Sequence, residues 1–211
     1  MTHVHQLTFG PFGENTYLIP DEDGNIIVID PGMYDAQENA RMFEYLNSQK
    51  LTPVRLILTH AHLDHVFGVN WFHSQYGLTP EVNAKDKVVY DSAQAVAMQY
   101  GLQMDKLVAP EVGLAAESSF RFGDVTFEIR FAPGHSPGSV CFYNSAENYV
   151  IAGDVLFQGS IGRTDLPGGD MDTLLSSIRS QLLTMPDEVI VYSGHGPLTT
   201  VGQERVSNPY L

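Results

Sequence analysis

Residues 59–65 read Thr-His-Ala-His-Leu-Asp-His and directly follow the run Val-Arg-Leu-Ile-Leu at residues 54–58. The apolar run predicts a buried strand, so the histidine-rich motif forms the loop that leaves its carboxyl end. Four side chains in this loop carry metal-ligating atoms: His60, His62, Asp64 and His65. Imidazole and carboxylate ligands together suit zinc, manganese or iron. The stretch therefore predicts a metal site at the end of a strand.

Three further potential ligands stand in turn-like segments after other predicted strands. His135 lies in Pro-Gly-His-Ser-Pro-Gly, Asp154 in Ala-Gly-Asp, and His195 in Gly-His-Gly-Pro. Because a histidine between glycine and proline has little local reason to be a packing residue, and because strand ends are where α/β folds gather their sites, we expect all three to join the metal site. The other histidines lie in a strand or on a helix without a partner motif, and we interpret them as ordinary side chains: His3, His5 and His73.

The pattern of the whole chain predicts a mixed α/β fold. Short apolar or alternating runs bounded by Gly, Pro, Asn or Asp predict strands at residues 3–9, 15–20, 26–30, 54–59, 125–132, 139–143, 149–153 and 188–193. Helical spacing of apolar residues predicts helices at residues 35–49, 66–76, 85–100 and 171–183, the first of them capped by Asp35. This order favours two sheets with helices packed outside both, in a single domain of residues 1–211.

The composition argues against several classes of partner. The 25 acidic residues outnumber the 11 basic ones, and a net charge of −14 repels nucleic acids and anionic bilayers. We find neither a secretory leader nor an apolar stretch long enough to span a membrane. Cys141 is the only cysteine and cannot form an internal disulfide, so we expect a cytoplasmic protein. Its position in an alternating strand pattern predicts that Cys141 is buried rather than nucleophilic.

The four histidine and aspartate motifs, in this order and on these strands, resemble the metallo-β-lactamase superfamily, as does Val-Ile-Asp-Pro-Gly at residues 28–32. Gly-Arg-Thr-Asp at 162–165 and Gly-His-Gly-Pro-Leu-Thr-Thr at 194–200 resemble its compact glyoxalase-II-like (hydroxyacylglutathione hydrolase-like) branch. The resemblance implies a four-layer αββα sandwich. In some members a cysteine occupies the position of Asp154, so the aspartate here argues against a true β-lactamase.

The resemblance also implies two metal sites. Its ligand pattern assigns His60, His62 and His135 to the first ion, Asp64, His65 and His195 to the second, and Asp154 to both. Asp64 and Asp154 are then the catalytic carboxylates, around a hydroxide that two divalent ions activate as the nucleophile. Zinc is the expected metal, with iron and manganese as alternatives. Asp30 is either an outer carboxylate that orients a ligand or simply a turn residue before Pro31.

Glyoxalase II activity implies hydrolysis of S-lactoylglutathione or a related small thiol-carrier thioester. Sixteen residues follow His195, so we do not expect the C-terminal helical domain with which longer glyoxalase II enzymes bind glutathione. Arg163 either binds a substrate carboxylate or forms an ion pair with Asp165. The longer enzymes carry a tyrosine where this chain has Asp165, which weakens the assignment to glutathione.

Other functions on the same fold remain alternatives. They are a mono-iron persulfide dioxygenase, which shares the Gly-Arg-Thr-Asp motif, a lactonase, and a binding protein on an inactive scaffold. The resemblance does not assign residues 85–107. Met98 and Met104 in this segment either line the substrate site or, as we prefer, belong to the core or to a dimer contact. We expect a monomer or a homodimer whose partner is a small molecule.

Overall fold

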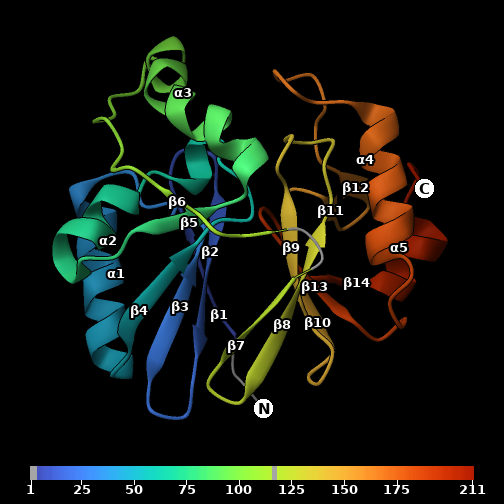
Figure 1. Cartoon of the computed structure of the whole chain (residues 1–211), viewed down its shortest axis with the longest axis horizontal. Coiled ribbons are helices and arrows are strands. Elements are labelled where there is room, and N and C mark those ends of the chain that lie inside the picture. Colours follow the sequence, from blue (N-terminus) through green and yellow to red (C-terminus); the bar gives the residue numbers. More distant parts are fainter. Residues whose placement is uncertain (1–3, 116–117) are drawn as a thin grey trace. The chain divides into compact units, whose positions relative to one another are not determined.

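The computed structural model describes residues 4–115 and 118–211, and His3 lies outside this range. The chain divides into two compact units, each built on its own sheet (Figure 1). The first unit contains the chain up to Val82 together with Lys87–Gly113. The second contains Asn83–Asp86 and Leu114–Leu211. The chain thus leaves the first unit for four residues before it returns to it.

The sheet of the first unit has six strands, which lie in sequence order. They are β1 (His5–Phe9), β2 (Glu14–Pro20), β3 (Asn25–Ile29), β4 (Thr52–Ile57), β5 (Pro80–Val82) and β6 (Glu111–Val112). The first three pair antiparallel, and β3 to β6 pair parallel. A parallel pair needs a crossover connection, which here contains helix α1 (Ala36–Gln49) between β3 and β4 and α2 (Val69–Tyr76) between β4 and β5. Helix α3 (Lys87–Gln99) precedes β6.

Helix α1 shows how the sequence determines local structure in this unit. The Asp35 side chain accepts hydrogen bonds from the backbone N–H groups of Gln37 and Glu38, as a cap at this position should. Met42 and Leu46, one turn apart, are buried in the core of the first unit. Burying two such side chains contributes on the order of 3–6 kcal/mol, which holds the helix on its sheet.

The sheet of the second unit is mostly antiparallel. Its strands, in spatial order, are β14 (Thr199–Thr200), β13 (Ile190–Ser193), β10 (Tyr149–Gly153), β9 (Val140–Asn144), β8 (Val125–Phe131) and β7 (Ser119–Phe122). Only the neighbours β10 and β13 pair in parallel among these strands. The unit also contains the hairpin β11 (Leu156–Phe157) and β12 (Ser160–Ile161), helix α4 (Met171–Ser177) with a π-helical continuation (Ile178–Leu182), and α5 (Val201–Ser207).

The structure confirms the mixed α/β class with two sheets. Each of the eight strands and four helices predicted from the sequence is present, with ends shifted by a few residues. The sequence patterns missed α5, which has only seven residues, and the short strands β5, β6, β7, β11, β12 and β14, in which two to four residues are too few to show a period. The single-domain assignment stays a prediction. No helix in the described part of the chain combines the length and apolar composition needed to cross a bilayer.

Candidate metal centre

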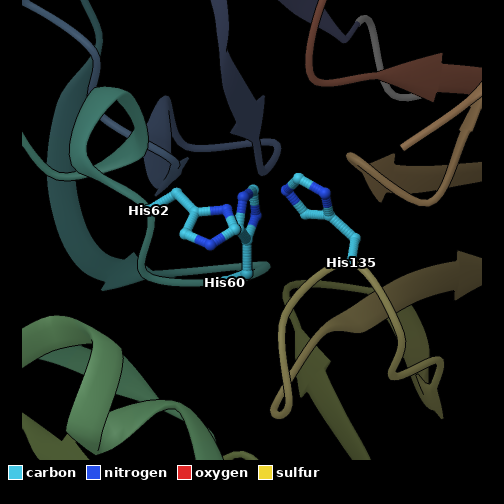
Figure 2. Close-up of side chains that lie close together, drawn as sticks. All are labelled: His60, His62 and His135. Carbon is cyan, nitrogen blue, oxygen red and sulfur yellow. The ribbon is translucent and has the colours of Figure 1, made fainter. Parts of the chain in front are cut away.

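The histidine-rich motif forms the loop that follows β4, as the sequence predicts. A short 3-10 turn, η1 (Leu63–His65), carries the end of the motif. His60 and His65 are buried and their ring centroids lie 4.0 Å apart, whereas His62 is half-buried. The rings of His60 and His62 meet edge to face with centroids 4.9 Å apart (Figure 2). Asp64 Oδ2 lies 3.9 Å from His65 Nε2, so the loop brings all four predicted ligands of the first unit together.

Asp30 lies at the centre of a hydrogen-bond network behind this loop. Its Oδ1 accepts the N–H of Thr59 at 2.7 Å, and its Oδ2 accepts the Thr59 hydroxyl at 2.5 Å. The same Oδ2 lies 3.0 Å from Nδ1 of His65, and the Thr59 oxygen lies 3.1 Å from Nδ1 of His60. Two imidazoles therefore have their Nδ1 atoms anchored, which assigns the ligand role to Nε2. Donor atoms of Asp30, His60 and His65 all lie within 4.8 Å of one another.

Glu14 is a buried residue of this region that the sequence analysis missed. Its Oε2 accepts the hydroxyl of Thr16 at 2.9 Å, and the oxygen of that hydroxyl accepts the N–H of Gly32 at 2.9 Å. A side chain at Gly32 would overlap the Glu14 carboxyl group, so the carboxyl group requires glycine there. Its Oε1 lies 3.9 Å from His65 Nδ1. Burial raises the pKa of Glu14 well above 4.5, and the neighbouring His65 opposes the shift.

The second unit brings its three predicted ligands together around Asp154. Oδ2 of Asp154 lies 3.5 Å from Nε2 of His135 and also 3.5 Å from Nε2 of His195. Asp154 and His195 follow the neighbouring parallel strands β10 and β13, whose carboxyl ends lie at the same edge of the sheet. A hydrogen bond from Gly194 N to Gly153 O, 2.8 Å long, joins the two loops directly.

His135 lies on the loop between β8 and β9, shown in Figure 2. Its Nδ1 lies 2.7 Å from the backbone oxygen of Arg163, so Nε2 is again the atom that faces Asp154. The contact depends on Gly162, because a Cβ there would overlap the Asp154 carbonyl and lie 3.0 Å from His135 Nδ1. The Gly-Arg-Thr-Asp motif therefore contributes a backbone carbonyl that fixes a histidine.

The side chain of Arg163 forms the ion pair with Asp165 that the sequence left as one of two alternatives. Nε and Nη2 donate to the two carboxylate oxygens at 2.7 Å each. This hydrogen bonding lowers the pKa of Asp165 to about 2. Both side chains are more than half exposed, so the pair contributes little to stability.

Two further predictions concern residues outside the ligand set. Cys141 is fully buried in β9 with Sγ 3.5 Å from the carbonyl of Ala152, as predicted. Met104 packs against the core of the first unit, whereas Met98 on α3 is 73% exposed. Met104 therefore has the core role that we preferred.

The donor set fits divalent metal ions. The first unit offers three imidazoles and a carboxylate, and the second offers two imidazoles and a carboxylate. Three of the imidazoles are anchored through Nδ1 to an oxygen acceptor, which is the arrangement that orients metal-ligating histidines. The residue types suit zinc, iron or manganese.

Comparison with known proteins agrees with this chemistry. The model of the family described as the metallo-beta-lactamase superfamily matches residues 9–195. The hydroxyacylglutathione hydrolase GloC of Haemophilus influenzae is 39% identical over 204 residues, which are 95% of this chain and 93% of that protein. A crystal structure of TTHA1623 in a di-iron-bound form has a TM-score of 0.88 and 38% identity, covering 98% of this chain and 100% of that one. The BLEG-1 B3 metallo-β-lactamase has a TM-score of 0.88 and 36% identity, covering 99% of each chain.

Proposed function

Because the chain belongs to the metallo-β-lactamase superfamily, we propose that it is a metal-dependent hydrolase of the glyoxalase II type that cleaves S-lactoylglutathione or a related small thiol-carrier thioester. The observation that carries this proposal is the 39% identity with GloC over almost the whole of both chains. All seven donors that the superfamily pattern requires are present.

We assign the ligands as the superfamily pattern does. His60, His62 and His135 bind one ion, Asp64, His65 and His195 bind the other, and Asp154 binds both. Zinc is our first choice, and the di-iron form of TTHA1623 supports iron as the alternative. When bound, such ions activate water at neutral pH and polarise a carbonyl.

The protein's own residues have three tasks in this reaction. The imidazoles of His60, His65 and His135 are oriented with Nε2 as the ligand atom, because their Nδ1 atoms are held by oxygen acceptors. The carboxylates of Asp64 and Asp154 bring negative charge to the cations and accept hydrogen bonds from water at the site. Asp30 acts through His65 as an outer carboxylate. Cys141 takes no part, because its thiol is buried in the sheet.

We propose that Arg163 binds a carboxylate of the substrate. Its carbonyl contacts His135 Nδ1, so its backbone lies beside a proposed metal ligand. Asp165 competes for the guanidinium group, but in solvent this exposed pair opens at little cost. A substrate with a carboxylate in its thiol carrier would then replace Asp165.

We further propose a cytoplasmic enzyme, monomeric or homodimeric, that acts on a small molecule and binds neither nucleic acid nor membrane. The net charge of −14 supports the last two exclusions, because it repels polyanions.

The test is elemental analysis of protein prepared without added metal, followed by assay of thiol release from S-lactoylglutathione. We expect two metal ions per chain and turnover that is lost in Asp154→Ala. His73→Ala is the matched control, since its ring contacts the Leu78 carbonyl rather than the site, and it should keep both properties.

Other results would overturn specific parts of the proposal. Two bound ions without thioester cleavage, but with hydrolysis of a lactone or a β-lactam, would make the substrate assignment wrong. One iron ion per chain, together with consumption of oxygen when glutathione persulfide is the substrate, would identify a dioxygenase. Asp154→Ala with full metal content and full turnover would refute the ligand assignment.

A further inference from the structure

The four residues Asn83–Asp86 lie in the second unit, although the chain on either side belongs to the first. Two contacts fix this segment. The Asn83 side-chain N–H donates to the carbonyl of Leu114 at 2.6 Å, and the Lys85 ammonium lies 4.6 Å from the centre of the Phe131 ring. Asp86, at the end of the segment, is completely buried.

The Asp86 carboxyl group accepts two hydrogen bonds from the loop that carries His135. Its Oδ1 accepts the hydroxyl of Ser136 at 2.5 Å and the N–H of Gly138 at 2.7 Å. Packing is equally close, because a Cβ on Gly138 would lie 2.6 Å from Cβ of Asp86 and would overlap its backbone nitrogen. The loop and the carboxyl group therefore fit together only because residue 138 is glycine.

His135 is thus fixed from two directions. Its ring is held at Nδ1 by the carbonyl of Arg163, whereas the backbone that follows it is held by Asp86 through Ser136 and Gly138. Without the Asp86 carboxyl group, the Ser136 hydroxyl and the Gly138 N–H would be buried without this acceptor. The loop would then have to move to satisfy both groups. Movement of the loop would carry Nε2 of His135 away from Asp154.

We propose that Asp86 is a positioning residue for His135 and that it acts on metal binding through the loop of residues 133–139. The proposal rests on the proposed function only in taking His135 as a metal ligand. It gives the start of the segment 85–107 a role that the superfamily pattern does not assign. Outer residues that orient ligands typically change metal affinity or activity 10- to 100-fold when substituted.

The test compares Asp86→Ala, Asp86→Asn and Ser136→Ala with the wild-type chain. Asn144→Ala is the matched control, because Asn144 is equally buried and its Oδ1 also accepts two backbone N–H groups, from Ala146 and Glu147. It lies at the opposite end of β9 from the His135 loop. Two quantities are measured: cobalt(II) affinity from the visible d–d absorption, and amide hydrogen exchange of Gly138 in metal-free protein.

We expect Asp86→Ala to weaken binding of cobalt by about 10- to 100-fold and to accelerate exchange at Gly138 at least tenfold. Asp86→Asn should restore both in large part, because its amide oxygen can accept the same two hydrogen bonds. Asn144→Ala should lower stability and leave cobalt affinity unchanged. If Asp86→Ala does not fold, Ser136→Ala decides, since it removes one donor and should weaken cobalt binding severalfold.

The proposal is wrong if the folded Asp86 or Ser136 variants bind cobalt with wild-type affinity, or if Asn144→Ala weakens binding equally. Failure of the proposed function would look different. A wild-type chain that binds cobalt but cleaves no thioester would refute the substrate, while a loss of cobalt affinity in Asp86→Ala would still support the positioning role.

Discussion

Oδ2 of Asp30 lies 3.0 Å from Nδ1 of His65, and both side chains are almost completely buried. The same carboxylate accepts the N–H and the hydroxyl of Thr59, whose oxygen lies beside His60 Nδ1. One carboxylate therefore orients two proposed metal ligands. Asp30 also has a φ of 52°, a left-handed conformation that asparagine tolerates well.

Asp30→Asn should lower metal affinity by about tenfold or more while the chain still folds. Asparagine keeps the backbone conformation and the acceptor for Thr59 N–H, but places an N–H₂ group where Oδ2 received the Thr59 hydroxyl. Calorimetric zinc titration of both proteins measures the change. Asp21→Asn, in an exposed turn of the same unit, is the control and should bind zinc normally. Unchanged affinity in Asp30→Asn would show that the carboxylate charge is unimportant.

Glu14→Gln should stabilise the metal-free protein increasingly as pH rises. Burial raises the pKa of Glu14, so the folded state holds this proton more tightly than the unfolded state. The contribution of Glu14 to stability therefore decreases as pH rises above about 4.5, and this decrease ends at the folded-state pKa of Glu14. Glutamine has no such proton, so the difference in unfolding free energy should widen over this range. Urea unfolding from pH 4 to pH 8 measures it, and a pH-independent difference would contradict the prediction.

Asp165→Asn should lower KM for S-lactoylglutathione severalfold. The substitution removes the carboxylate that binds both Nε and Nη2 of Arg163, so the guanidinium binds a substrate carboxylate with less competition. Stability should change by less than about 0.5 kcal/mol, because the pair is exposed. Steady-state kinetics on a thioester without a carboxylate provides the control. An equal change in KM for both substrates would exclude a charge-specific role for Arg163.

Cys141→Ala should leave turnover unchanged and lower the unfolding free energy by about 1 kcal/mol, because it removes a buried sulfur from β9. The native wild-type thiol should react with a thiol reagent only upon unfolding. Loss of turnover in a folded Cys141→Ala chain with full metal content would show that the thiol acts in the reaction.

The sequence alone predicted the long strands and the seven proposed ligands, because runs such as residues 54–58 have a clear apolar pattern and the ligands follow them in Gly-rich or His-rich motifs. It could not predict Glu14 or Asp86. In the sequence, Glu14 looks like any acidic residue near a strand, and Asp86 looks like a residue at the start of a helix. Only tertiary packing shows what each carboxyl group contacts. For Arg163 the sequence offered two partners, since an exposed side chain has little local constraint.

The chain passes between the two units after Val82, Asp86 and Gly113. A gene cut after residue 113 would therefore yield an upstream polypeptide that carries Asp86 and a downstream one that carries the His135 loop without its acceptor. Split reporters or domain shuffling at that boundary would separate the two, whereas a cut after Val82 keeps residues 83–86 on the same polypeptide as the His135 loop.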